Sequence, residues 1–343
     1  MRKFIRKVRN GKDLNYEEMT EASLFLFDER TSEEEIGEFL VALAEKGETA
    51  YEVAALAEVT RGLAIKPRVP DAPYFDNCGT GGDGSGSFNI STASAFVLAA
   101  AGVPVAKHGN RKISSKSGSS DVLEALGIRL EQDPEETAEQ LRQEGLAFLF
   151  APQLHPKMKR IGGVRQRLGR RTIFNLTGPL TNPMPLDTQF TGISRKEFTM
   201  GYASVLRMQG RQRAIVVCGA GGMDEASLAG PNDFVLLDRG DLIPFTLDAE
   251  DVGLDHAPAS AIRGGDGREN AEIIRRLLSG EKGPHFDTVA FNAGIGLFAA
   301  GRTRTAKEGV ELATGTLASG KAMEKLEAVT AFQQQYRKEA VAR

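Results

Sequence analysis

The chain has 343 residues, of which 41% are hydrophobic and 26% are charged, and its formal net charge is −3. This length suits a small domain joined to a larger one, and the composition is that of an ordinary globular protein. The slight acidic excess does not favour a nucleic-acid-binding protein. The sequence also contains no apolar run as long as a membrane span.

The cysteines and the first residues indicate a cellular location. Cys78 and Cys218 are far apart, so neither a disulfide framework nor a zinc-binding spacing is visible. Residues 1–10 are basic, but no apolar segment follows them, so they do not form a secretory signal. We therefore expect a cytoplasmic protein with reduced cysteines.

Helical patterns alone fill the first part of the chain. Apolar residues recur at helical spacing there, and capping signals of Ser or Thr followed by Glu stand at 32–35 and 49–52. Prolines at 67, 70 and 73 then end the pattern. Residues 1–70 are predicted to form a helical domain, joined by a later helical segment, and 71–343 a second domain.

Short apolar runs alternate with helical patterns from residue 74 onward. This alternation predicts an α/β domain with a mainly parallel central sheet and surrounding helices. Two runs that flank Arg239-Gly240 predict an added hairpin. The predicted buried strands are 74–78, 103–106, 146–151, 213–218 and 288–291, and the predicted helices include 133–145, 198–209, 269–279, 306–319 and 321–337.

A glycine-rich loop, GTGGDG at 79–84, follows the first predicted strand and precedes a helix start at Asn89-Ile90-Ser91-Thr92. Such glycines let several backbone N–H groups point into one hollow, and a helix N-terminus adds partial positive charge. Phosphate or pyrophosphate is the natural ligand of this arrangement, although a tight strand-to-helix turn uses the same residues. Lys107, Arg111 and the serines at 114–119 add cationic and hydroxyl donors that favour the anion site.

The motifs DNCGTGGD, FNISTA, KHGNR and SSKSGSSDVLEALG within 76–127 resemble the anthranilate phosphoribosyltransferase family of tryptophan biosynthesis. So do HP-x-M-K at 155–159, GPLTNP at 178–183 and VVCGAGGMDEASLAG at 216–230. The resemblance covers nearly the whole chain. It implies the fold shared by nucleoside phosphorylases and phosphoribosyltransferases, with a helical N-terminal domain and an α/β domain. Departures are Gly162-Gly163, where the family often has Ala-Pro, and Gly221, where an aspartate is common.

The resemblance implies transfer of the phosphoribosyl group of 5-phosphoribosyl 1-pyrophosphate to anthranilate. The products are N-(5-phosphoribosyl)anthranilate and pyrophosphate, and no covalent nucleophile is needed. The residues expected to bind phosphoribosyl pyrophosphate are Gly79, Gly82, Asp83, Ser87, Asn89, Ile90, Ser91, Thr92, Lys107, Asn110, Arg111, Ser114, Ser115 and Ser119.

Arg165 matches the family's arginine for the anthranilate carboxylate. A planar guanidinium can bind a carboxylate through two parallel hydrogen bonds, which a lysine cannot. From spacing alone, Arg165 is more typical of a solvated helix position than of a ligand, and a lone histidine such as His155 is more typical of a hydrogen-bonded packing residue. The residues expected to bind anthranilate are Gly79, His108, Asn110, His155 and Arg165.

Asp224 and Glu225 follow the predicted strand 213–218. Adjacent carboxylates are most often solvated surface charge, but at the end of a buried strand that faces a pyrophosphate loop they suit Mg²⁺, which prefers oxygen ligands. The resemblance implies that this pair holds one Mg²⁺ and that the Ser91 hydroxyl holds another, giving two Mg²⁺ per active site.

Two other functions remain open from the residues. A pyrimidine nucleoside phosphorylase has a similar layout, but it carries a Lys-Met-Ser-Gly-Arg run where this chain has KHGNR at 107–111, and it needs no Asp-Glu pair. A non-enzymatic nucleic-acid-binding relative should be basic and lack parts of the substrate motifs. We therefore expect small-molecule substrates and neither nucleic acid nor membrane as partner.

The resemblance also implies a homodimer that forms through the N-terminal helices. These helices carry more large apolar side chains than one thin layer can easily hide. The side chains on which this expectation rests are Leu24, Phe25, Phe27, Phe39 and Leu40.

Overall fold

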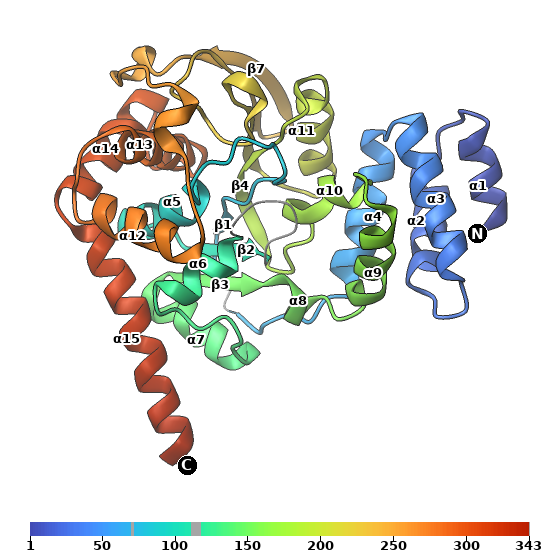
Figure 1. Cartoon of the computed structure of the whole chain (residues 1–343), viewed down its shortest axis with the longest axis horizontal. Coiled ribbons are helices and arrows are strands. Elements are labelled where there is room, and N and C mark those ends of the chain that lie inside the picture. The colour runs from blue at the N-terminus through green and yellow to red at the C-terminus, as the bar shows by residue number, and fades with distance from the viewer. Residues whose placement is uncertain (70–71, 111–117, 343) are drawn as a thin grey trace.

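The computed structural model describes residues 1–69, 72–110 and 118–342. Its N-terminal helices form a lobe beside a larger body (Figure 1). Both predicted capping signals are present, since Ser32 accepts a hydrogen bond from the Glu35 N–H and Thr49 forms a capping box with Glu52. The lobe consists of α1 (Arg2–Arg9), α2 (Tyr16–Phe27), α3 (Glu33–Lys46) and α4 (Ala50–Gly62).

The described part of the larger body contains one seven-stranded sheet in the order β3-β2-β1-β4-β5-β6-β7. The strands from β3 to β5 run parallel, and β6 and β7 add the predicted antiparallel hairpin. The predicted class, a helical domain followed by a mainly parallel α/β domain, is thereby confirmed. The strands are β1 (Tyr74–Asp76), β2 (Val105–Gly109), β3 (Leu146–Phe150), β4 (Leu186–Gly192), β5 (Arg213–Cys218), β6 (Asn232–Asp238) and β7 (Asp241–Leu247).

One predicted strand is wrong and one strand was missed. Residues 288–291 lie inside the helix α13 (Pro284–Ala299), not in the sheet. This helix is buried on nearly all sides, so its apolar residues show no helical stripe and resemble a buried strand. The missed strand, β4, carries Thr188, Gln189 and Thr191 at buried positions, which interrupt the apolar run that would have marked it.

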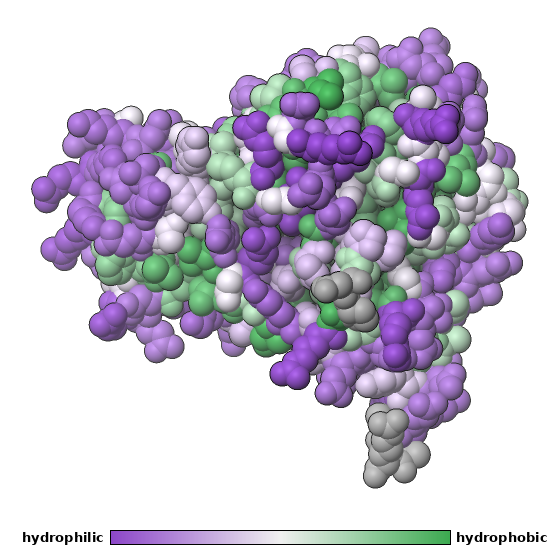
Figure 2. Space-filling model, turned by 180° about the vertical axis from the view of Figure 1, so that it is seen from behind, coloured by the Kyte–Doolittle hydropathy of each residue, from purple (hydrophilic) through white to green (hydrophobic). Residues whose placement is uncertain are grey.

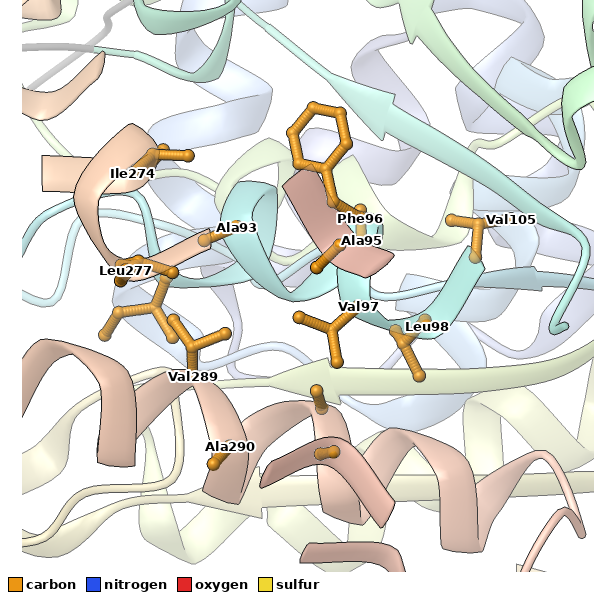
Figure 3. Packing of buried hydrophobic residues seen from close by; sticks show 14 of the residues in the cluster. Ala93, Ala95, Phe96, Val97, Leu98, Val105, Ile274, Leu277, Val289 and Ala290 are labelled. Carbon is orange, nitrogen blue, oxygen red and sulfur yellow. The ribbon is translucent and has the colours of Figure 1, made fainter. Parts of the chain in front are cut away.

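Helices pack around the sheet, and the largest apolar cluster joins them to it. Figure 3 shows side chains of α5, such as Ala93 and Phe96, among those of α12 and α13, such as Leu277 and Val289. Among the described residues, none of the helices combines the length and apolar character needed to cross a membrane. The remaining α-helices are α5 (Ile90–Ala100), α6 (Ser119–Ala125), α7 (Pro134–Glu144), α8 (Ala151–Leu154), α9 (Met158–Leu168), α10 (Phe174–Thr177), α11 (Thr199–Met208), α12 (Gly267–Leu278), α14 (Ala306–Ala318) and α15 (Lys321–Ala342). The short 3₁₀ segments are η1 (Gly178–Leu180), η2 (Lys196–Phe198), η3 (Ala220–Gly222), η4 (Glu250–Val252) and η5 (Ala259–Ile262).

The helix α9, which carries Arg165, lies against the N-terminal helices (Figure 1). Ile161 and Val164 pack in the same apolar cluster as α1 to α4. The Arg160 guanidinium donates to the carbonyl of Asp28 at 3.0 Å. The helix continues through Gly162-Gly163, so this departure from the family pattern does not break the segment. Packing against the lobe therefore fixes the helix on which Arg165 is presented.

Candidate active site

The candidate site lies at the carboxyl ends of β1 and β4, where the strand order reverses. From β1 the chain goes to β2 on one side, whereas β4 and β5 lie on the other. Ligands of open α/β sheets bind at such a switch point. Two hydrogen bonds join the ends of these strands: the Thr80 N–H donates to Gly192 O at 2.9 Å, and the Thr191 hydroxyl donates to Cys78 O at 2.6 Å.

The glycine loop after β1 has the backbone conformation that only glycine adopts readily. Gly81, Gly82 and Gly84 have φ values of 72°, 73° and 79°. The loop leads into α5, and the side chain of its N-cap residue, Asn89, accepts a hydrogen bond from Asn270 at 2.8 Å. The loop thus brings curled backbone to the N-terminus of an eleven-residue helix, an arrangement that attracts anions.

The acidic pair lies directly beside this loop. The Gly81 N–H donates to Asp224 Oδ2, and the Asp224 N–H donates to Asp83 Oδ2 at 3.4 Å. Burial raises the pKa of the Asp224 carboxyl, and the nearby Asp83 charge raises it further. Burial and the Asp224 charge likewise raise the pKa of Glu225, while Lys107 and a hydrogen bond from Ser91 oppose that rise. These two carboxylates are therefore short of positive charge.

The donor set fits Mg²⁺ only in part. Within the described residues, no three or more His, Cys, Asp or Glu side chains are grouped so that they could hold a metal. Asp224, Glu225 and the Ser91 hydroxyl nevertheless offer the hard oxygen atoms that Mg²⁺ prefers. Mg²⁺ is usually held by one or two carboxylates together with substrate phosphates and water. The residues therefore fit an ion that arrives with a phosphorylated substrate.

Lys107 supplies a buried positive charge on the same side. Its side chain is 2% exposed, and Nζ donates to the carbonyl of Asn77 at 3.3 Å. The buried Asp76 carboxylate accepts hydrogen bonds from the His108 N–H at 3.3 Å and from Asn182 at 2.9 Å. Burial raises the pKa of Asp76 to about 6, although the Lys107 charge opposes the rise. Lys107 therefore balances part of the negative charge of both Asp76 and Glu225.

Two of the residues predicted for anthranilate, His108 and His155, form a second, neutral neighbourhood. His108 and His155 stack edge to face with ring centroids 5.3 Å apart. Burial lowers the pKa of His108 to about 3 and that of His155 to about 4, so both rings are neutral near pH 7. His108 Nδ1 lies 3.2 Å from the carbonyl of Gly178, which accepts a hydrogen bond from it, and Nε2 is left as a bare acceptor.

Arg165 contacts the same segment as His108, because its partners and Gly178 are neighbours in sequence. The guanidinium donates to Asn175 Oδ1 at 3.3 Å and lies 5.7 Å from the ring centroid of Phe174. Burial lowers the pKa of Arg165. Among the described residues, no carboxylate forms an ion pair with it. A partly buried guanidinium without a carboxylate suits an anionic ligand.

The remaining residues predicted for the site either lie outside the described residues or contact neighbouring parts of the chain. Arg111, Ser114 and Ser115 lie outside the described residues, and Asn110 borders them. Ser119 Oγ donates to Asn110 O at 3.1 Å, and Ser87 Oγ pairs with Ser85 Oγ at 3.2 Å. The Ile90 side chain is buried in the core, and its N–H donates to Phe88 O. The Thr92 hydroxyl is buried without a hydrogen-bond partner among the described groups, whereas Gly79 lies against Asp224 and Gly82 O accepts a hydrogen bond from Arg171.

Several residues that build the site were not predicted for it. Asn182 joins Asp76 to the carbonyl of Ala106, and Asn292 binds the residue that follows Glu225. Asn182 lies in the GPLTNP motif, whereas Asn292 lies in none of the motifs described above. In neither case did the sequence indicate the distant partner.

Models of a glycosyl transferase family match the two parts of the chain: the helical bundle domain matches residues 2–64 and the a/b domain residues 71–323. The fold and site thus define a glycosyl transferase of the type with a helical bundle and an α/β domain. Anthranilate phosphoribosyltransferase of Exiguobacterium sibiricum is 54% identical over 335 residues, which are 98% of this chain and 99% of that protein. The chain belongs to the anthranilate phosphoribosyltransferase family.

Solved structures agree with this assignment. The crystal structure of anthranilate phosphoribosyltransferase from Thermus thermophilus has a TM-score of 0.91 and 45% identity, and the match covers 96% of this chain and 99% of that one. The Saccharomyces cerevisiae enzyme in complex with PRPP and Mg has a TM-score of 0.89 and 24% identity, with 97% of each chain covered. The yeast structure shows the shared fold.

Proposed function

We propose that the site transfers the phosphoribosyl group of 5-phosphoribosyl 1-pyrophosphate to anthranilate and releases pyrophosphate. The observation that carries the proposal is the Asp224-Glu225 pair at the strand switch point, where the buried Asp224 accepts a hydrogen bond from the glycine loop. Neither a nucleoside phosphorylase nor a nucleic-acid-binding role is favoured by a specific observation. The test is consumption of anthranilate by the whole protein with phosphoribosyl pyrophosphate and Mg²⁺.

The phosphorylated substrate occupies the loop between β1 and α5 in this proposal. The yeast protein of the same fold was solved with PRPP and Mg. Here Asp224, Glu225 and Ser91 would hold Mg²⁺, two ions per site, and bound Mg²⁺ supplies positive charge to the leaving pyrophosphate. The loop N–H groups, the N-terminus of α5 and Lys107 stabilise the same developing negative charge, which is electrostatic catalysis.

In this proposal, the site acts on anthranilate, the aromatic amine, by holding it in the position for reaction. Arg165 binds the anthranilate carboxylate, and the neutral rings of His108 and His155 line the pocket without adding charge. His108 Nε2, as a bare acceptor, can orient the amine N–H. An aromatic amine loses its proton only as the new bond to the sugar carbon forms, so a strong base is not required. No side chain needs to form a covalent intermediate.

The two parts of the chain have separate roles in the proposal. Residues 1–70, with α9 packed against them, form the helical domain, and residues 71–343 form the catalytic α/β domain. The pyrophosphate loop belongs to the second part, whereas Arg165 stands on α9, which packs with the first. Arg165 is thus held through the packing of α9 against the first part, whereas the other residues predicted for anthranilate lie outside that helix in the second part. A cytoplasmic location, predicted from the composition, completes the proposal.

We further propose that the chain forms a homodimer through the helical lobe. Phe39 and Leu40, part of the original expectation, are buried within the chain and cannot contribute. Leu24 on α2 is 55% exposed, and apolar green surface interrupts the purple on this lobe in Figure 2. Light scattering at micromolar concentration should give a dimer, and Leu24→Glu should shift it toward the monomer. A monomeric wild-type protein would rule this interface out.

A further inference from the structure

The backbone that carries Asp224 and Glu225 touches the ends of two strands directly. A Cβ atom on Gly192, the last residue of β4, would lie 1.7 Å from the carbonyl oxygen of Asp224. A Cβ atom on Gly219, just after β5, would lie 2.0 Å from the carbonyl oxygen of Glu225. No side chain fits at either position. The acidic loop is therefore seated against the strand ends at backbone contact distance.

Asn292 of α13 fixes the residue that follows the acidic pair. The Ala226 N–H donates to Asn292 Oδ1 at 2.8 Å, and Asn292 Nδ2 donates to Ala226 O at 2.8 Å and to Thr288 O at 2.9 Å. Asn292 is 1% exposed, so no water competes for these bonds. One side-chain amide thus pairs with both polar groups of a single backbone residue, and no apolar side chain could replace it.

Asn232, the first residue of β6, fixes Ser227, the residue after Ala226. Its Oδ1 accepts from the Ser227 N–H at 2.7 Å and from the Ala220 N–H at 3.2 Å. Its Nδ2 donates to Ser227 O at 3.0 Å. Asn232 therefore ties the residues after the acidic pair to the turn before it, and Asn292 adds the tie to α13.

The loop that carries Asp224 and Glu225 needs these supporting contacts because the carboxylates on it repel one another. Asp224 and Glu225 are adjacent carboxylates with Asp83 close by, and like charges in a poorly solvated place repel. A loop free to move would relax by separating them or turning them to solvent. Groups behind metal ligands that hold them in place typically affect metal affinity by about 10–100-fold.

We propose that Asn292 and Gly192 are positioning residues that hold the Asp224-Glu225 backbone in its metal-binding conformation. The inference rests on the proposed metal role of this pair. In this proposal, metal affinity depends on the amide of Asn292 and on the missing side chain at Gly192, which act through the backbone around the acidic pair.

The first test measures Mn²⁺ binding to the whole protein by electron paramagnetic resonance, with phosphoribosyl pyrophosphate present. Asn292→Ala should weaken Mn²⁺ binding by about 10–100-fold. Gln140→Ala is the matched control, since Gln140 is also a fully buried amide, bonded to Leu146 O in a different part of the fold. The control should lose a similar amount of thermal stability but keep its Mn²⁺ affinity within about twofold of wild type.

Gly192→Ala provides an independent variant. Its methyl group must displace the Asp224 carbonyl, whereas Gly315→Ala on α14 adds a Cβ with nothing within 4 Å. The first should weaken Mn²⁺ binding and the second should not. If Asn292→Ala does not fold, Asn292→Ser, which keeps a hydroxyl at the position, takes its place in the comparison.

The reference is the double variant Asp224→Ala/Glu225→Ala. Adding Asn292→Ala to it should weaken Mn²⁺ binding no further, because the carboxylates that Asn292 positions are gone. If Asn292→Ala and Gly192→Ala bind Mn²⁺ as tightly as wild type while the reference does not, the positioning inference is overturned and the metal assignment stands. If the reference also keeps wild-type affinity, the metal assignment falls and the inference falls with it.

Discussion

Replacing Asp224 and Glu225 together by Ala should lower turnover by about a hundredfold or more and raise the Mg²⁺ concentration needed for half-maximal rate. A metal supplies several kcal/mol of transition-state stabilisation, and each 1.36 kcal/mol is about a tenfold change in rate. Because burial raises the pKa of both carboxyls, protons compete with the metal, so wild-type Mg²⁺ affinity should increase as the pH rises.

The measurement is the initial rate as a function of Mg²⁺ concentration at saturating substrates. A control variant removes two exposed carboxylates instead, Glu272→Gln on α12 and Glu311→Gln on α14, and should behave as wild type. An unchanged Mg²⁺ dependence in the Asp224→Ala/Glu225→Ala variant would show that the pair is only charge beside the loop.

Arg165→Ala should raise the KM for anthranilate by roughly one to two powers of ten and leave the KM for phosphoribosyl pyrophosphate nearly unchanged. Loss of a charge-assisted hydrogen-bonded pair costs about 1.5–3 kcal/mol, and each 1.4 kcal/mol is about tenfold in affinity. Arg165→Lys should recover little, because an ammonium cannot bind both carboxylate oxygens in parallel. Lys107→Ala should have the opposite effect and raise the KM for phosphoribosyl pyrophosphate before that for anthranilate.

Steady-state kinetics with each substrate varied in turn decide this prediction. Arg167→Ala is the matched control, since Arg167 lies on the same helix but pairs with Glu33 at the surface. It should leave both KM values within about twofold. If Arg165→Ala raises the KM values of both substrates equally and keeps wild-type thermal stability, the aromatic pocket must lie elsewhere.

The local parts of the fold followed from the sequence because their causes are local. Ser32 and Thr49 cap the helices that they were predicted to cap, and the turn at Arg239-Gly240 joins the predicted hairpin. Arg239 has φ 50°, so the turn uses a left-handed residue followed by glycine. Signals of this kind depend on residues within a few positions of one another, and a single sequence contains them in full.

The elements that depend on burial were harder to predict. An apolar run is the same whether the buried element is a helix or a strand, which accounts for residues 288–291. In β4, the Gln189 side chain can be fully buried because its polar groups are satisfied. Its amide donates to Pro179 O at 2.7 Å, and its oxygen accepts from Arg211. Such compensation lies in the tertiary structure, so the sequence alone suggested a polar segment.

In the candidate site, too, local motifs were visible in the sequence, whereas long-range contacts were not. Motifs placed the acidic pair near the glycine loop, and the hydrogen bond from Gly81 to Asp224 joins residues 143 positions apart. The supporting asparagine Asn292 lies 66 positions from its partner Ala226, and Asn182 lies 106 from Asp76. No spacing rule links such pairs. Candidate residues for the chemistry could thus be named from the sequence and stay a prediction, while the groups that hold them were found only in the structure.

The most direct test of the proposed function is the fluorescence of anthranilate mixed with the purified protein, phosphoribosyl pyrophosphate and Mg²⁺. The fluorescence should fall as anthranilate is consumed, and omission of either Mg²⁺ or the phosphorylated substrate should stop the loss. Aniline, which lacks the carboxylate expected to bind Arg165, should react far more slowly. Constant anthranilate fluorescence with all components present, or equal rates with aniline, would contradict the function proposed for this site.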